Sequence, residues 1–125
     1  MQYDDITKLI LQACFEVSNE LGSGFLESVY EKSLLVALED LGLNARAQVP
    51  IKVNFRNRVV GDYFADIMVN NQVLIELKAV KKLAPEHVAQ VLNYLKASKI
   101  EAGLLVNFGN PRLEYRRFNN YSSPI

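Results

Sequence analysis

Three ionisable side chains interrupt a stretch of apolar, strand-forming sequence in the middle of the chain. Asp66 stands in one predicted strand, and Glu76 and Lys78 stand in the next. Burying such charges costs free energy unless they pair with one another or hold a metal ion. Two carboxylates with a lysine beside them therefore indicate a divalent-metal site of the kind that promotes phosphodiester hydrolysis.

The predicted hairpin brings these three side chains within reach of one another. A tight turn is expected at Asn70-Asn71, because Asn tolerates positive φ. Glu76 and Lys78 are two residues apart on a strand, so their side chains leave the same face. Asp66 lies across the hairpin, but the sequence does not fix its register with Glu76.

Oxygen ligands of this kind suit Mg²⁺ or Mn²⁺. The candidate ligands are the carboxylates of Asp66 and Glu76 and the main-chain carbonyl of Leu77. Lys78 is placed to orient an attacking water or to offset phosphate charge. The structural alternative is a cross-strand ion pair at a sheet surface, which contributes about 0–1 kcal/mol.

Two helical motifs add polar groups at regular spacing. Glu27 and Tyr30 are three residues apart, and Gln90 and Tyr94 are four apart, so each pair shares one helical face. His87 lies one turn before Gln90 and has no assigned role. Each of these residues also has a purely structural explanation. The helix dipole favours Glu in a first turn, and Tyr30 could pack in the core. Gln90 could lie on the surface beside a half-buried tyrosine.

The elements that must carry these residues follow an α-α-β-β-β-α-β order. Hydrophobic periodicity predicts helices over 4–21, 25–41 and Pro85–Ser98, and strands over 45–55, 59–69, 72–79 and 102–108. The last strand follows a helix, so we expect it to pair in parallel with an earlier strand through a right-handed crossover. Residues 113–125 are a candidate mobile tail.

Length and composition favour a single domain spanning residues 1–125. Half of the residues are apolar, and the 14 basic and 14 acidic residues balance, which argues against a strongly basic nucleic-acid coat. No apolar run approaches the roughly 18 residues of a membrane span. Cys14 is the only cysteine, so no internal disulfide forms and the residue is expected in the core. We expect a cytoplasmic protein.

The motifs occur together in a recognisable order. They are Gly24-x-x-Glu27-x-x-Tyr30, Gln48-Val-Pro50, Asp66, Glu76-Leu-Lys78-Ala, His87-x-x-Gln90-x-x-x-Tyr94-Leu and Gly103-Leu-Leu-Val-Asn107-Phe. This ordered set resembles the GxxExxY family of small prokaryotic proteins, which is grouped with the PD-(D/E)XK nuclease superfamily. The resemblance covers roughly residues 5–118, and the set is far more specific than any one motif.

The resemblance implies an α/β fold with a restriction-endonuclease-like core, a mixed sheet of four or slightly more strands flanked by helices. It implies that Asp66, Glu76 and Lys78 are the catalytic triad of the superfamily. Ala65 departs from the pattern, because it stands where the superfamily's name places Pro. That position often varies, so the departure weakens the match only slightly.

The resemblance also assigns roles on two helices. It implies that Glu27 is an additional acidic residue close to the metal. Gln90 and Tyr94 match the glutamine-tyrosine motif of exonuclease-like branches, in which the glutamine supports the site.

Three functions remain open at this point. The first is a metal-dependent nuclease acting on DNA, with RNA as the second choice of substrate. The second is a non-catalytic nucleic-acid- or protein-binding module on the same fold, which suits the small size and neutral charge. The third is an α/β domain with surface ion pairs.

A domain this small covers few base pairs, so we expect a homodimer or a partner protein. The basic residues that could meet phosphates are Lys81, Lys82, Arg112, Arg116 and Arg117. For any one of them, a solvated surface charge is the simpler interpretation.

Overall fold

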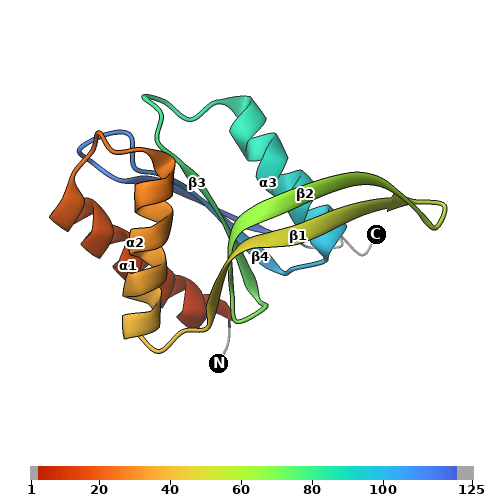
Figure 1. Ribbon diagram of the computed structural model, residues 1–125, viewed down its shortest axis with the longest axis horizontal. Helices are drawn as coiled ribbons and strands as arrows, with labels where there is room; N and C mark the ends of the chain where they lie inside the picture. Colours follow the sequence, from red (N-terminus) through yellow and green to blue (C-terminus); the bar gives the residue numbers. More distant parts are fainter. Residues whose placement is uncertain (1–2, 121–125) are drawn as a thin grey trace.

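The computed structural model describes residues 3–120 and consists of a five-stranded mixed sheet with helices on both faces (Figure 1). The elements are α1 (Tyr3–Leu21), α2 (Glu27–Asp40), β1 (Ala45–Phe55), β2 (Arg58–Val69), β3 (Val73–Lys78), α3 (Pro85–Ser98), β4 (Ala102–Asn107) and β5 (Glu114–Asn119). The strands lie side by side in sequence order, and β3 and β4 are parallel while the other neighbouring pairs are antiparallel. The predicted α/β class, mixed sheet and element order are confirmed.

The strand β5 was not among the elements predicted from the sequence. Residues 114–119 fall in the segment that was a candidate mobile tail, yet they pair antiparallel with β4 along its whole length. The strand is hard to see in the sequence because its side chains are largely exposed and charged, as suits the edge of a sheet. Residues 121–125 of that segment lie outside the described residues.

Two hydrophobic cores lie on opposite faces of the sheet. The helices α1 and α2 cover one face, and α3 covers the other (Figure 1). Strands β3 and β4 are buried on both faces, which is why both are mostly apolar in sequence, apart from Glu76 and Lys78 in β3 and Asn107 in β4. Cys14 is fully buried under the first face, as expected, and burial raises the pKa of its thiol to about 12.

The sheet divides between β2 and β3, and this division sets the position of the site. Asn70 and Asn71 form the predicted turn, with φ of 52° and 55°. The ladder from Val69↔Val73 ends at Ile67↔Ile75. The earlier part of β2 pairs with β1 alone. We call this two-stranded extension, residues 49–65, the arm, and it projects alongside α3 (Figure 1).

Among residues 3–120, no helix is both long enough and apolar enough to cross a membrane.

Candidate active site

Asp66 and Glu76 occupy the point where β2 and β3 separate. Beyond Ile67↔Ile75 the strands no longer bond to each other, so their main-chain groups need other partners. The Asp66 N–H donates to Glu76 Oε2 at 2.8 Å, and the Leu77 N–H donates to Asp66 Oδ2 at 2.8 Å. The two carboxylates therefore replace the missing ladder bonds and are held close together by the backbone.

The Glu76 side chain is 2% exposed. Burial, and after it the neighbouring Asp66 carboxylate, raise its pKa to about 8, against the lowering effects of the Asp66 N–H and of Lys78. The pair therefore keeps a proton at neutral pH when no cation is present. A site that disfavours its own negative charge in this way is one that a divalent cation would stabilise.

Lys78 follows Glu76 on the same face of β3. Leu74 packs in the core under α3 and Ile75 and Leu77 pack in the opposite core, so alternation directs Glu76 and Lys78 toward α3. Lys78 is partly buried, and its charge acts on Glu76. Asp66, Glu76 and Lys78 are thus brought together, and the sequence had indicated this grouping.

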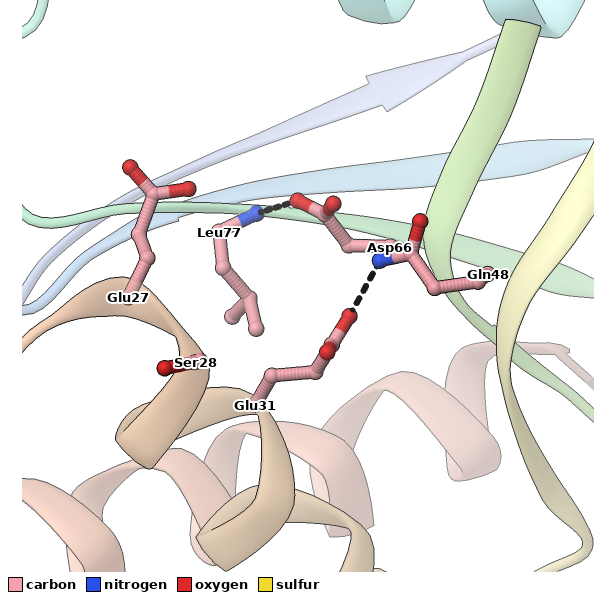
Figure 2. Close-up of a pocket in the computed structure, with 6 residues that line it drawn as sticks. All are labelled: Glu27, Ser28, Glu31, Gln48, Asp66 and Leu77. Carbon is pink, nitrogen blue, oxygen red and sulfur yellow. Dashed lines mark hydrogen bonds between the residues drawn. The ribbon is translucent and has the colours of Figure 1, made fainter.

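A pocket opens on the other side, between α2 and the strands. It has a volume of about 180 Å³ (Figure 2). Its lining residues are Glu27, Ser28, Glu31, Gln48, Asp66 and Leu77. Glu27 is exposed in the first turn of α2 and shares this pocket with Asp66, so two of the predicted metal ligands face one small cavity.

Glu31 belongs to the same pocket and was not singled out from the sequence. Gln48 Nε2 donates to Glu31 Oε1 at 2.6 Å, which ties α2 to β1 (Figure 2). The available signal was spacing, because Glu31 lies four residues after Glu27 and therefore on the same helical face. Gln48 itself has a φ of 53°, an uncommon value that turns β1 at the level of the pocket.

The donor set suits a hard divalent cation, although it is not a closed cage. Within residues 3–120, no three His, Cys, Asp or Glu side chains lie close enough together to hold an ion. Mg²⁺ commonly uses only one or two carboxylates and keeps several waters. Asp66 and Glu76 match that number of carboxylates, and the exposed Glu27 side chain lines the same pocket as Asp66.

Tyr94 on α3 lies close enough to Glu76 for the two groups to interact, and Gln90 is hydrogen-bonded to Tyr94. Gln90 Nε2 donates to Tyr94 Oη at 3.2 Å. Burial raises the pKa of Tyr94, and the charge of Glu76 adds to the effect. In the part of the chain that the structure describes, Gln90 Oε1 is a buried side-chain acceptor without a hydrogen-bond partner. Such an atom is rare and is available to a water or a ligand donor.

Comparison with known proteins identifies the family. A model of the PD-(D/E)XK nuclease superfamily matches residues 4–118. The chain belongs to this superfamily. PD-(D/E)XK nucleases generally depend on divalent metal ions, and the nuclease family indicates nucleic-acid binding.

Two solved structures share the fold. The crystal structure of SSO0001 matches with a TM-score of 0.56 and 24% identity over 75% of this chain, which spans half the length of that protein. An alkaline exonuclease (LHK-Exo) from Laribacter hongkongensis matches with a TM-score of 0.53 and 12% identity, over 89% of this chain and 77% of the exonuclease. Comparison with curated proteins gives no significant match.

Tyr30 positions the start of helix α2 and does not line the pocket that contains Asp66. Its hydroxyl donates to the Gly22 carbonyl at 2.6 Å and accepts from the Phe25 N–H at 3.2 Å. Its fully buried ring stacks on Phe108 with centroids 4.7 Å apart. The tyrosine therefore fixes the loop that leads into Glu27, and the structural interpretation of Tyr30 is confirmed.

Asn107 fixes the loop that follows Lys78, a role that the sequence did not reveal. Its side chain is fully buried, accepts from the Val80 N–H at 2.9 Å and donates to the Val80 carbonyl at 2.8 Å. Position 109 has no room for a side chain, because a Cβ there would lie 2.0 Å from the Val80 carbonyl oxygen. The chain following Lys78 is thus clamped to the end of β4.

Four of the remaining predicted residues have contacts of their own. His87 Nδ1 accepts from the Ala84 N–H at 2.9 Å and so caps the start of α3. Arg117 pairs with Asp4 on α1. Lys82 and Arg116 line a separate pocket of about 400 Å³ beside β5 and not the pocket that Asp66 lines.

Proposed function

We propose that this chain is a metal-dependent nuclease that hydrolyses phosphodiester bonds in DNA, and that it belongs to the prokaryotic GxxExxY branch of the superfamily. The observation that carries the proposal is the Asp66–Glu76 pair, in which Glu76 is buried, each carboxylate accepts a main-chain N–H of the opposite strand, and Lys78 lies nearby. The assignment to the GxxExxY branch is supported by the tyrosine of that motif, because Tyr30 anchors the loop before Glu27.

The proposed ligands of Mg²⁺ or Mn²⁺ are Asp66, Glu76 and the Leu77 carbonyl, with Glu27 completing the set. The ion, when bound, would neutralise phosphate charge and lower the pKa of the attacking water. Lys78 orients that water and offsets the charge that develops on the phosphate.

Gln90 and Tyr94 brace the proposed site from α3. The Gln90 amide holds the Tyr94 hydroxyl and leaves its own Oε1 as an acceptor. That acceptor suits a water or the amino group of a base, because a phosphodiester has no proton to donate.

A binding module without catalysis is the second candidate. It is favoured by the lack of three clustered ligand side chains among residues 3–120 and by the zero net charge of the chain. In this case a partner protein or a second copy of the chain would supply the ligand side chain that the site lacks. A cytoplasmic location is also proposed, since the single cysteine is buried and unpaired.

Metal-dependent cleavage tests the nuclease proposal. The protein would be incubated with linear duplex, single-stranded and branched DNA, with the matching RNA strands, in Mg²⁺, Mn²⁺ or EDTA. We expect cleavage with metal and none in EDTA. Cleavage that survives EDTA would contradict the mechanism. Metal binding without cleavage would indicate a metal site that lacks its partner or proper substrate, and neither cleavage nor metal binding would favour the binding module.

Metal affinity tests the ligand assignment directly. Asp66→Ala is expected to weaken Mn²⁺ binding at least about tenfold, because it removes a carboxylate from the ion and frees the Leu77 N–H. Isothermal titration of Mn²⁺ measures this effect. Asp40→Ala, which changes an exposed carboxylate at the far end of α2, is the matched control. Equal affinities of Asp66→Ala and the parent would remove Asp66 from the ligand set.

A further inference from the structure

A second and larger hollow lies on the α3 side of the protein. It is a groove of about 940 Å³ between α3 and the arm, which run alongside each other (Figure 1). Lys52 and Tyr63 line it from the arm, and Gln90, Tyr94 and Lys96 line it from α3. This volume lies near the upper end of the roughly 300–1,000 Å³ range of small-ligand pockets.

The groove leads to the candidate active site. Gln90 and Tyr94 line it, and the charge of Glu76 acts on the Tyr94 hydroxyl. The unpartnered Gln90 Oε1 lies at this junction. A strand lying in the groove would therefore contact Tyr94, the residue on which the charge of Glu76 acts.

The charge of the groove favours an anionic occupant. Its lining contains the three lysines Lys52, Lys96 and Lys99 and one carboxylate, Glu86. The whole chain has no net charge, so this excess is local. Lys52 is paired with Asp62 at 3.1 Å, which leaves Lys96 and Lys99, both exposed, as the principal phosphate contacts.

The aromatic residues of the groove favour an occupant with flat rings. Tyr63 is 49% exposed on the arm, and its ring lies 5.6 Å from the Tyr94 ring at an angle of 42°. Exposed tyrosine faces stack unpaired bases, and lysines beside them track the backbone in sites for single strands. In a duplex the bases already stack on one another, so their faces are hidden from such a side chain.

We propose that the groove between α3 and the arm binds a single nucleic-acid strand and leads it to the Asp66–Glu76 pair. A base stacks on Tyr63, and phosphates lie near Lys96 and Lys99. The delivery of the strand to the carboxylates rests on the proposed nuclease function. Binding of the strand in the groove does not, since it requires neither metal nor cleavage.

Fluorescence anisotropy in EDTA tests this inference without any cleavage. The probes are a fluorescein-labelled thymidine strand of about twelve nucleotides, a uridine strand of the same length and a duplex of the same length. We expect the single strands to bind more tightly than the duplex. Tyr63→Ala should raise the Kd for the thymidine strand about tenfold, because it removes a stacking surface. Tyr115→Ala is the control, since Tyr115 is similarly exposed at 44% but lies on β5.

The lysine contribution is measured by the salt dependence of binding. Lys96→Ala should weaken binding and lower the slope of log K against log salt by about 0.7, as expected for one lost phosphate contact with a single strand. Lys8→Ala on α1, which covers the opposite face of the sheet, is the matched control. A larger effect of the groove variants on the thymidine or the uridine strand identifies the natural substrate as DNA or RNA.

The outcomes separate this inference from the proposed function. If the groove variants bind every strand as the parent does, or if the duplex binds more tightly than the strands, the inference is wrong even when the protein cleaves DNA. If they lose single-strand binding while no cleavage is ever detected, the groove assignment stands and the nuclease proposal fails.

Discussion

Glu76→Gln is expected to make the metal-free protein more stable above pH 8 while lowering its metal-dependent nuclease activity about a thousandfold. The two effects have one origin, because Glu76 is buried beside Asp66. Glutamine keeps an oxygen that accepts the Asp66 N–H but carries no charge. The variant should therefore fold normally and lack one ligand for the ion, and a thousandfold loss corresponds to about 4 kcal/mol of transition-state stabilisation.

The pH dependence follows from the pKa of Glu76. Its folded-state pKa is about 8, above the usual value of 4.5. Between these values the unfolded chain has released a proton that the folded chain retains, so the unfolding free energy falls as pH rises and stays low above pH 8. Each pKa unit corresponds to about 1.4 kcal/mol, so the fall is on the order of a few kcal/mol.

Urea unfolding in EDTA at pH 5, 7 and 9 measures this effect as the difference between the parent and Glu76→Gln. The difference isolates Glu76 from other titrating groups. Glu39→Gln, at an exposed position of α2, is the control and should follow the parent at every pH. If the parent and Glu76→Gln show the same stability profile from pH 5 to pH 9, Glu76 does not have the raised pKa. Saturating Mn²⁺ should reverse the order of stability at pH 9, because the ion binds more tightly to the parent, which keeps both carboxylates, than to Glu76→Gln.

Tyr30→Ala is expected to reduce the unfolding free energy by about 3–5 kcal/mol, the usual cost of deleting a large buried aromatic side chain. It removes the stacked contact with Phe108 and leaves a cavity between α2 and the end of β4. It also removes the partners of the Gly22 carbonyl and the Phe25 N–H. Chemical unfolding monitored by circular dichroism measures the loss.

Tyr30→Phe separates the two contributions of this residue. It keeps the ring stacked on Phe108 and removes only the hydroxyl, so the expected loss is about 1–2 kcal/mol. Because the hydroxyl fixes the loop before Glu27, this variant should also weaken Mn²⁺ binding more than its stability loss explains. Should Tyr30→Ala cost less than about 1 kcal/mol, the residue does not anchor α2.

Much of the site was visible in the sequence because it depends on short-range geometry. The turn at Asn70-Asn71 joins two strands, so Asp66 and Glu76 had to lie on opposite sides of one hairpin. Alternation along β3 placed Lys78 on the face of Glu76. Helical spacing likewise paired Gln90 with Tyr94, and the structure joins them by a hydrogen bond.

Other features depend on contacts between segments distant in sequence. Glu31 enters the pocket because α2 packs beside β1 and Gln48 reaches it. Asn107 acts on Val80, 27 residues earlier, and β5 forms only because β4 offers it an edge. The groove beside α3 exists because the arm leaves the sheet at Ile67 and extends past the helix.

The sequence by itself determined the helices, the first four strands and the identity of the acidic pair, because periodicity and turn chemistry are local properties. Only the tertiary structure decided that β2 and β3 separate at Asp66, so that each carboxylate accepts a main-chain N–H of the opposite strand. The burial of Glu76 and its raised pKa follow from that packing. No local pattern encodes them, because desolvation of a carboxylate depends on every element that surrounds it.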